Sequence, residues 1–191
     1  MSEAALWLLE QLWAPIVAVT AAHGGRSSGL ISSTALNASL VPEAPRVSVQ
    51  LSKHNLTHDL VLASRALAIH LLAPDESGLA LFRTLGTSSG HTHRKLDGLA
   101  TRPGETGSPI LSGAVSWLEA RVVSSLDGDE STIVLADVVA ASGATDIPFL
   151  TIEHVRERLS PDARRAWAER YQAEVEAARS ARAGGRATPP A

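Results

Sequence analysis

A run of small polar side chains interrupts an apolar stretch near the start of the chain. Within residues 29–45, five such side chains fall in eight consecutive positions: Ser32, Ser33, Thr34, Asn37 and Ser39. Each hydroxyl or amide that is buried must find a hydrogen-bond partner. A ligand with many donors and acceptors, such as a sugar, a ribityl chain or a phosphate, would supply those partners. A polar edge strand that faces solvent would have the same composition, so the residues alone leave both interpretations open.

A second polar segment, residues 52–60, adds positive charge. It holds Lys53, the imidazoles of His54 and His58, and Thr57, which we expect to be the N-cap of a short helix over residues 58–64. A helix N-terminus presents unpaired N–H groups and positive dipole charge to an anion. The segment therefore indicates a phosphate-binding turn, and the alternative is an ordinary surface turn with a capping threonine.

Two pairs of histidines raise the question of a metal site. His54 and His58 are four residues apart, and His91 and His93 lie in a long polar loop. No Asp, Glu or Cys stands at a spacing that would complete a specific site, so we predict no metal and interpret these as surface or hydrogen-bonding histidines. The same loop carries Lys95, which could meet an anionic ligand. No triad, carboxylate dyad or reactive cysteine is evident, and we predict no catalytic side chain.

The elements that must position these residues are mostly short strands. A tight turn is expected at residues 23–25, and irregular chain over 86–107. Expected strands cover residues 16–22, 26–31, 46–51, 67–72, 114–126 and 133–139, and expected helices cover 3–13, 58–64 and 75–85. Many short strands without βαβ alternation favour a β-barrel over a Rossmann-type sheet.

The character of the chain changes after residue 146. Residues 161–183 are rich in Ala, Arg and Glu, with Trp167, Tyr171 and Val175 spaced four apart. This pattern predicts an amphipathic helix with a narrow apolar stripe, which packs either on its own barrel or on a partner subunit. We expect a barrel domain over residues 1–150, a helical extension over 151–183 and a disordered tail over 184–191.

Composition limits the classes of function. The 191 residues are 45% hydrophobic and 19% charged, with a net charge of −3, which argues against nucleic acid as a partner. The absence of cysteine excludes disulfides, thiolate catalysis and iron–sulfur clusters. No apolar run reaches the roughly eighteen residues of a membrane span, and the N-terminus lacks the basic region of a signal peptide. We therefore expect a cytoplasmic protein without a membrane partner.

The ordered set of motifs resembles the flavin reductase family, whose fold is the FMN-binding split barrel. The resemblance depends on the Gly and paired small residues before Thr34, the later Ser-Leu-x-Pro, a Val-rich strand and the polar turn that ends in Thr57. It extends over residues 15–141, about two thirds of the chain. The cofactor-binding residues that it implies are Ser32, Ser33, Thr34, Asn37, Ala38, Ser39, Ser52, Lys53, His54, Thr57 and Lys95.

The resemblance also implies an activity and partners. The expected fold is mainly β with peripheral helices, and the expected cofactor is FMN, with FAD as the other possible form. Family members pass hydride from NAD(P)H to flavin, form homodimers, and can supply reduced flavin to a monooxygenase.

Three positions depart from the family's pattern. Glu130 stands where many flavin reductases carry a histidine that is linked to nicotinamide binding, Ala35 and Leu36 where a phenylalanine is usual, and Leu96 where another is common. A carboxylate at residue 130 would repel the phosphates of a dinucleotide. It favours an alternative function: a split barrel that binds flavin, or haem, without efficient NAD(P)H turnover.

Overall fold

The structure is a computed structural model that describes residues 15–185, with side chains placed as far as residue 183. The helix expected over residues 3–13 lies outside the described residues, as does most of the expected tail. Residues 184 and 185 belong to the last helix.

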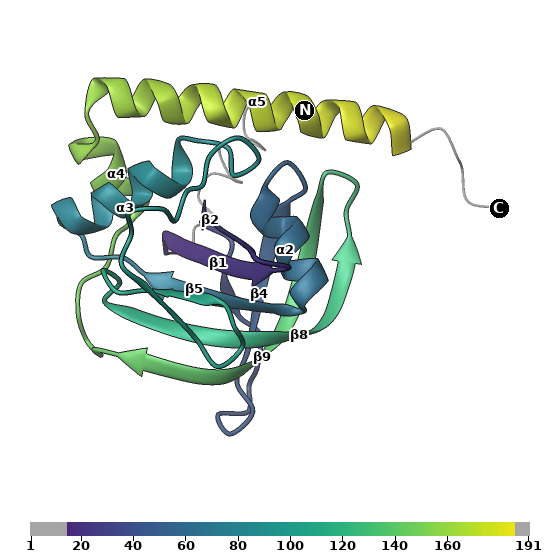
Figure 1. Cartoon of the computed structure of the whole chain (residues 1–191), viewed down its shortest axis with the longest axis vertical. Helices are drawn as coiled ribbons and strands as arrows, with labels where there is room; N and C mark the ends of the chain where they lie inside the picture. Colours follow the sequence, from purple (N-terminus) through teal and green to yellow (C-terminus); the bar gives the residue numbers. More distant parts are fainter. Residues whose placement is uncertain (1–14, 186–191) are drawn as a thin grey trace.

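Seven strands form one antiparallel sheet in the order β2-β1-β5-β8-β9-β4-β3 (Figure 1). All six expected strands are present, and the last of them extends beyond the expected bounds at both ends. The strands of the sheet are β1 (Val17–His23), β2 (Arg26–Ser32), β3 (Leu36–Asn37), β4 (Arg46–Ser52), β5 (Ala66–Leu71), β8 (Ser116–Asp127) and β9 (Ser131–Gly143). A separate ribbon pairs β6 (Thr101–Pro103) with β7 (Pro109–Leu111).

The first hairpin forms because its turn residues tolerate an unusual backbone. Gly24 and Gly25 have φ angles of 56° and 75°. A two-residue hairpin turn of this kind needs positive φ at both positions, which glycine adopts without steric cost. The expected turn is therefore confirmed, and it sets β1 against β2 with His23 opposite Arg26.

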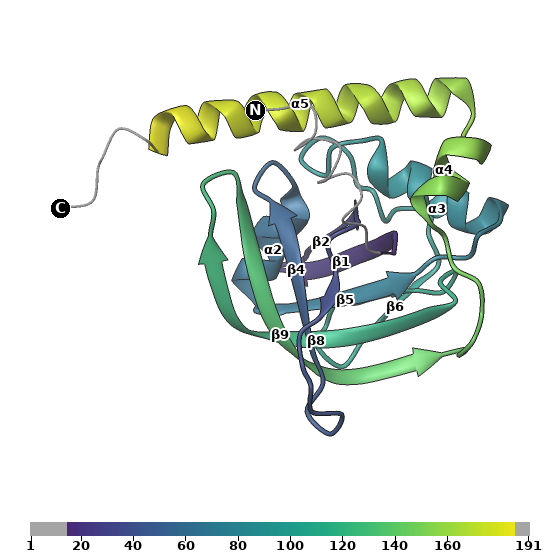
Figure 2. The same ribbon diagram turned by 180° about the vertical axis from the view of Figure 1, so that it is seen from behind.

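Thr34 brings the two edges of the sheet together. Its hydroxyl donates to the carbonyl of Gln50 at 3.1 Å and accepts from the Gln50 N–H at 3.1 Å. Thr34 follows β2 at one edge, and Gln50 lies in β4, next to the other edge. The sheet thus curls into an incompletely closed barrel, which Figure 2 shows from behind. This arrangement confirms the predicted split barrel.

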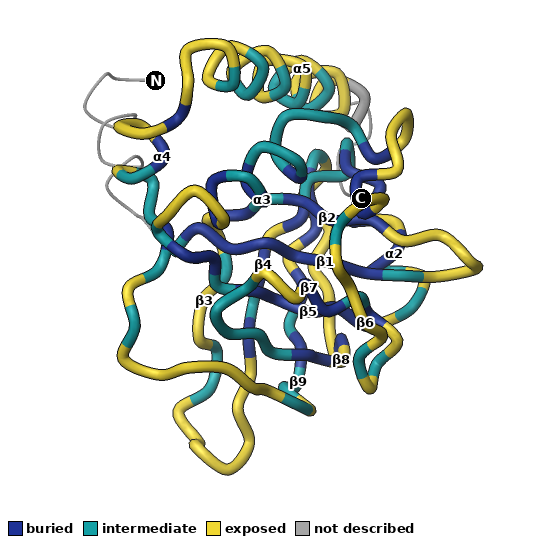
Figure 3. Tube along the Cα trace, turned by 60° about the vertical axis from the view of Figure 1, so that its left-hand side comes forward, coloured by how far each residue is buried: buried dark blue, intermediate teal, exposed yellow. Residues whose placement is uncertain are grey.

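Period-two alternation divides the core into two layers. Along β1, Val17 and Val19 pack inside the barrel with residues of β4, β8, β9 and α2. Ala18 packs on the other face with Phe82 and residues that follow the barrel. Successive side chains of a strand point to opposite faces, so one strand can serve both layers. Figure 3 shows β1 and β5 buried between them, whereas the β3–β4 connection and the outer face of the last helix are exposed.

Within residues 15–185, four helices surround the sheet: α2 (Leu56–Ser64), α3 (Glu76–Gly86), α4 (Ile152–Arg158) and α5 (Pro161–Gly185). Asp75 caps α3 by accepting from the N–H of Ser77 at 2.9 Å. The expectation that Thr57 caps α2 is wrong, because the N-cap is Asn55 and Thr57 is buried inside the helix. Helix α4 lies within the helical extension expected over residues 151–183, but a separate helix was not expected there, since its capping box pairs Thr151 with His154 rather than with Glu or Gln.

Helix α5 packs on its own chain, which is one of the two alternatives left open by the sequence. Trp167 meets Phe82 of α3 edge-on, with ring centroids 5.4 Å apart. Figure 1 shows α5 lying across α3, β2 and α2. Trp167 of the predicted apolar stripe is therefore used within the chain, whereas Tyr171 of the same stripe is 61% exposed.

Candidate functional site

A cavity of about 480 Å³ lies beneath α5. We call it the polar cavity. One side is formed by the end of β2, the segment that follows it, and the end of β4. The other side is formed by α5, with Trp167, Arg170, Tyr171 and Glu174. Its size falls within the range of about 300–1,000 Å³ that is typical of small-molecule sites.

Hydroxyl groups on the barrel side are held in fixed positions. The hydroxyls of Ser32 and Thr34 lie 2.8 Å apart, and the Thr34 N–H donates to the Ser32 hydroxyl at 3.1 Å. Thr34 is in turn fixed by Gln50 of β4, as described above. Ser33 and Ser52 line the same cavity. These groups form a preorganised set of donors and acceptors for a polyhydroxylated ligand.

Lys95 supplies a buried cation at the base of the polar cavity. Only 4% of the residue is exposed, and its ammonium donates to the carbonyl of Leu85 at 2.7 Å. Leu85 lies in the last turn of α3, where unpaired carbonyls and the helix dipole favour a cation. The pKa of Lys95 is lowered to about 8, chiefly by burial and in addition by the charge of Arg170, while the carboxylate of Glu174 acts in the opposite direction. Lys95 is therefore mostly protonated at neutral pH.

The α5 side of the cavity carries a hydrogen-bonded network. Arg170 donates to the side-chain oxygen of Asn55 at 2.9 Å and to Oε1 of Glu174 at 3.1 Å. The Asn55 side-chain N–H₂ donates to the same Oε1 at 3.1 Å. The Arg170 side chain is 9% exposed and that of Glu174 is 27% exposed. Burial and the nearby Arg170 lower the pKa of His54, so this imidazole is neutral at physiological pH.

Five of the predicted binding residues line the polar cavity: Ser32, Ser33, Thr34, Ser52 and Lys95. They reach it from β2, β4 and the loop after α3. Sequence reasoning missed the residues of α5 and also Asn55. The only indication in the sequence was the spacing of Arg170 and Glu174, which are four residues apart and next to the predicted apolar stripe.

The other predicted residues lie elsewhere. The side chain of Asn37 accepts from the Ser39 N–H at 3.1 Å, and the N–H of Ala38 donates to Arg46 at 2.9 Å, so this part of the segment satisfies its own backbone. Lys53 forms an ion pair of 2.6 Å with Asp127 of β8.

His54 and Thr57 also stay outside the wall of the cavity. His54 lies close enough for the charges of Arg170 and Glu174 to affect it, as described above. Thr57 is 1% exposed within α2. The assignment of the predicted residues to a cofactor stays a prediction.

An apolar hollow of about 630 Å³ adjoins the same segment of chain. It is lined by Ala35, Leu36 and Asn37 on one side and by Trp117 and Val138 of the β8–β9 hairpin on another. Arg102 stacks over the Trp117 ring at 4.9 Å from its centroid. Residues 32–37 thus separate a polar cavity from an apolar one.

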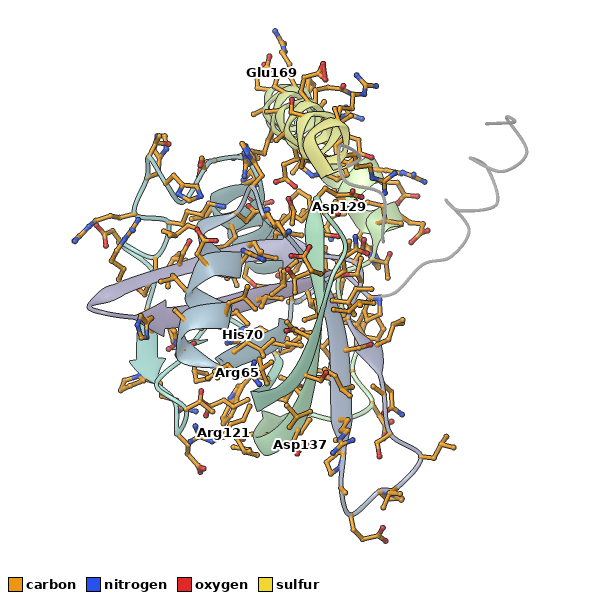
Figure 4. All side chains as sticks on the ribbon, turned by 90° about the vertical axis from the view of Figure 1, so that its right-hand side faces the viewer. Arg65, His70, Arg121, Asp129, Asp137 and Glu169 are labelled. Carbon is orange, nitrogen blue, oxygen red and sulfur yellow. The ribbon has the colours of Figure 1, made fainter. Side chains whose placement is uncertain are left out.

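Glu130 is not the free carboxylate that the sequence led us to expect. It lies in the tight turn between β8 and β9 and accepts two hydrogen bonds from Arg182 of α5. These bonds lower the pKa of Glu130. Figure 4 shows Asp129 of the same turn next to α5. The negative charge expected to repel a dinucleotide is therefore paired, and it ties α5 to the hairpin.

Two buried polar side chains serve the barrel itself. His70 donates from Nδ1 to the Ala18 carbonyl at 3.2 Å and accepts at Nε2 from the Leu111 N–H at 3.1 Å. Burial lowers its pKa to about 4, so the ring is neutral. Glu119 accepts from the N–H groups of Glu105 and Thr106 and from the Thr106 hydroxyl, at 2.6–2.9 Å. Burial alone would raise the pKa of Glu119, but these hydrogen bonds outweigh it and the pKa is lowered.

The described part of the chain gives two further observations. Among residues 15–183, no group of three or more His, Cys, Asp or Glu side chains is arranged to hold a metal ion. None of the helices within residues 15–185 is long and apolar enough to cross a membrane.

Comparison with known proteins agrees with this geometry. The profile of the flavin reductase like domain matches residues 9–159. The reductase component of 4-nitrophenol 4-monooxygenase/4-nitrocatechol 2-monooxygenase from Rhodococcus opacus is 33% identical over 135 residues, which are 70% of this chain and 68% of that protein. A high molecular weight rubredoxin from Moorella thermoacetica is 29% identical over 125 residues, 65% of this chain. The chain spans about half of the rubredoxin, since the match covers 53% of its length.

A solved structure shows the same fold. An FMN-binding protein from Thermus thermophilus superposes with a TM-score of 0.62 at 22% identity, over 69% of this chain and 72% of that one. The whole of α5 lies beyond the residues that the family profile matches. The family profile, the R. opacus relative and the split barrel together show that this chain belongs to the flavin reductase family.

Proposed function

We propose that the chain binds FMN and reduces it with NAD(P)H. The observation that carries the proposal is the polar cavity, in which ordered hydroxyls and the buried ammonium of Lys95 face one space. A ribityl chain needs hydroxyl partners, and a phosphate needs a cation and hydrogen-bond donors. The residues present therefore fit the polar tail of a flavin mononucleotide.

In this proposal, different residues bind different parts of the flavin. Ser32, Ser33, Thr34 and Ser52 bind the polar tail, and Lys95 balances the charge of the phosphate. The apolar hollow beside residues 35–37 offers a surface for the flat ring. A flavin, when bound, supplies the hydride chemistry, so the protein has to bind and orient it and needs no nucleophile of its own. FAD is the other form that such a site could hold.

We further propose that the reduced flavin is passed to a monooxygenase. Support comes from the R. opacus relative, which is named as the reductase component of 4-nitrophenol 4-monooxygenase/4-nitrocatechol 2-monooxygenase. We also propose a homodimer, because Leu36, Leu40 and Val41 expose large apolar side chains around the protruding β3–β4 connection. A second subunit would remove this surface from water.

A second function has a specific observation in its favour. Arg182 and Glu130 hold α5 over the turn where the family carries its nicotinamide-linked histidine. A chain of this kind could bind flavin without efficient turnover of NAD(P)H. The competing function is therefore a flavin-binding split barrel that acts as a carrier.

An absorption spectrum of the purified protein, followed by anaerobic titration with NADH and NADPH, tests these functions. We expect the visible bands of a bound flavin and their rapid bleaching by one of the two nucleotides. If flavin is bound but neither nucleotide bleaches it, the reductase function is rejected and the flavin carrier is the function that agrees with the result. A colourless protein that takes up neither FMN nor FAD would reject both.

A further inference from the structure

The polar cavity has a part that the family's matched region does not provide. Arg170 and Glu174 belong to α5, which begins at Pro161, whereas the family profile ends at residue 159. Both side chains line the cavity together with Lys95. Any ligand in this cavity therefore meets groups that lie outside the region matched by the family profile.

The α5 side of the cavity already binds an anion, namely the carboxylate of Glu174. Its Oε1 accepts from Arg170 and from Asn55, each at 3.1 Å. An oxygen that receives a guanidinium and an amide N–H₂ in this way occupies a position suited to a phosphate oxygen. Glu174 is more exposed than Arg170, so its carboxylate can turn toward solvent while the guanidinium stays.

The charges in the cavity favour such an exchange. Lys95 and Arg170 contribute two positive charges and Glu174 one negative charge, which leaves a net positive charge of one among these side chains that line the cavity. A phosphate monoester carries a charge of about −1.5 to −2 at neutral pH. It would neutralise both cations once Glu174 has moved away, whereas the single carboxylate neutralises only one.

We propose that Arg170 and Lys95 together form the phosphate subsite of the cofactor, and that Glu174 occupies this subsite as an internal competitor. The inference rests on the proposed flavin function and deepens it. Arg170 then confers a preference for flavin phosphates over riboflavin, and Glu174 limits the affinity for the phosphate.

The position of Arg170 does not depend on its own ion pair. Helix α5 is also held by the contact between Trp167 and Phe82 and by the pairing of Arg182 with Glu130. Substitution of Arg170 or Glu174 should therefore leave the helix in place. Thermal unfolding of each variant checks this.

The test compares the dissociation constants of FMN and riboflavin, measured by fluorescence titration of the apoprotein. Arg170→Gln removes one charged contact to the phosphate, so it should weaken FMN binding about 10- to 100-fold. Riboflavin has no phosphate, and its binding should change little. Glu174→Gln should act in the opposite direction and strengthen FMN binding at least about threefold. Two effects of opposite sign, both confined to FMN, would not arise from a purely structural role.

Two residues on the solvent side of α5 provide matched controls. Arg165 is 70% exposed, and Figure 4 shows Glu169 pointing away from the barrel. Arg165→Gln and Glu169→Gln change the charge of the helix by the same amounts and should alter neither affinity. An effect of the same size in these variants would attribute the result to net charge and overturn the proposal.

The remaining outcomes separate the two proposals. If the wild-type protein binds both flavins but Arg170→Gln leaves their ratio unchanged, the phosphate subsite is wrong and the flavin function stands. An equal loss of FMN and riboflavin affinity likewise overturns the subsite. If the wild-type protein binds neither flavin, the proposed function fails and the subsite fails with it.

Discussion

Raising the pH should weaken FMN binding through a single group, Lys95. Its pKa of about 8 lies below the ordinary lysine value of 10.5 because the ammonium is buried and faces Arg170. If only the protonated form binds the phosphate, the competent fraction falls from about nine tenths at pH 7 to about one tenth at pH 9. The dissociation constant of FMN should then rise about tenfold, which corresponds to about 1.4 kcal/mol of binding free energy.

His54 also lies near the charges of Arg170 and Glu174, and its lowered pKa keeps that ring neutral between pH 7 and 9. The phosphate of FMN loses its last proton near pH 6, so it is a dianion over the whole interval. Riboflavin has no phosphate, and its affinity should stay level between pH 7 and 9.

Fluorescence titrations of both flavins at several pH values provide the assay. Lys95→Met keeps the length of the side chain but removes the charge, so it should weaken FMN binding at pH 7 and flatten the pH profile. Lys53→Met distinguishes the two lysines, because Lys53 pairs with Asp127 outside the polar cavity. A profile that stays flat in the wild-type protein, or that is abolished by Lys53→Met and kept by Lys95→Met, would refute this reasoning.

Three further predictions concern stability and nicotinamide use. His70 stays neutral when folded, with a pKa of about 4, but takes up a proton below pH 6.5 when unfolded. The free energy of unfolding should therefore fall by up to about 3 kcal/mol between pH 6.5 and 4, and urea titrations of wild type and His70→Gln should show this loss only in the wild type. Glu119→Gln should lower the free energy of unfolding by about 2–4 kcal/mol in the same assay, because an amide N–H₂ would face buried N–H donors. A decrease below about 0.5 kcal/mol would contradict the structural role assigned to Glu119. Glu130→His should speed anaerobic bleaching of the flavin by NADH. Arg182→Gln is the matched variant, because it breaks the same ion pair without adding an imidazole. If the bleaching rate rises in neither variant, this turn does not limit reduction of the flavin.

Local patterns were enough to predict the barrel. Period-two alternation in β4 and the Gly24–Gly25 turn depend on neighbouring residues only, and both are present in the structure. The error at the start of α2 is one of position, because Asn55 and Thr57 are both residue types that cap helices and the helix begins at Leu56. The side chain of Asn55 would be a normal helix cap, but it makes no capping hydrogen bond, because it is bound by Arg170 and Glu174 of α5.

The site shows more clearly what a pattern of residue types can and cannot predict. The polar run that begins at Ser32 suggested one ligand-binding strand, yet the chain passes there from one edge of the barrel to the other. Its first residues consequently face the polar cavity, whereas Asn37 and the residues after it satisfy backbone groups near β3. The cation nearest in sequence, Lys53, is turned toward Asp127, and the cations that line the cavity are Lys95 and Arg170. Residue types alone thus suggested a ligand with hydroxyl groups and a phosphate, and the proposed flavin site in the polar cavity depends on that suggestion. The closure of the barrel determines which of the predicted cations lines the cavity.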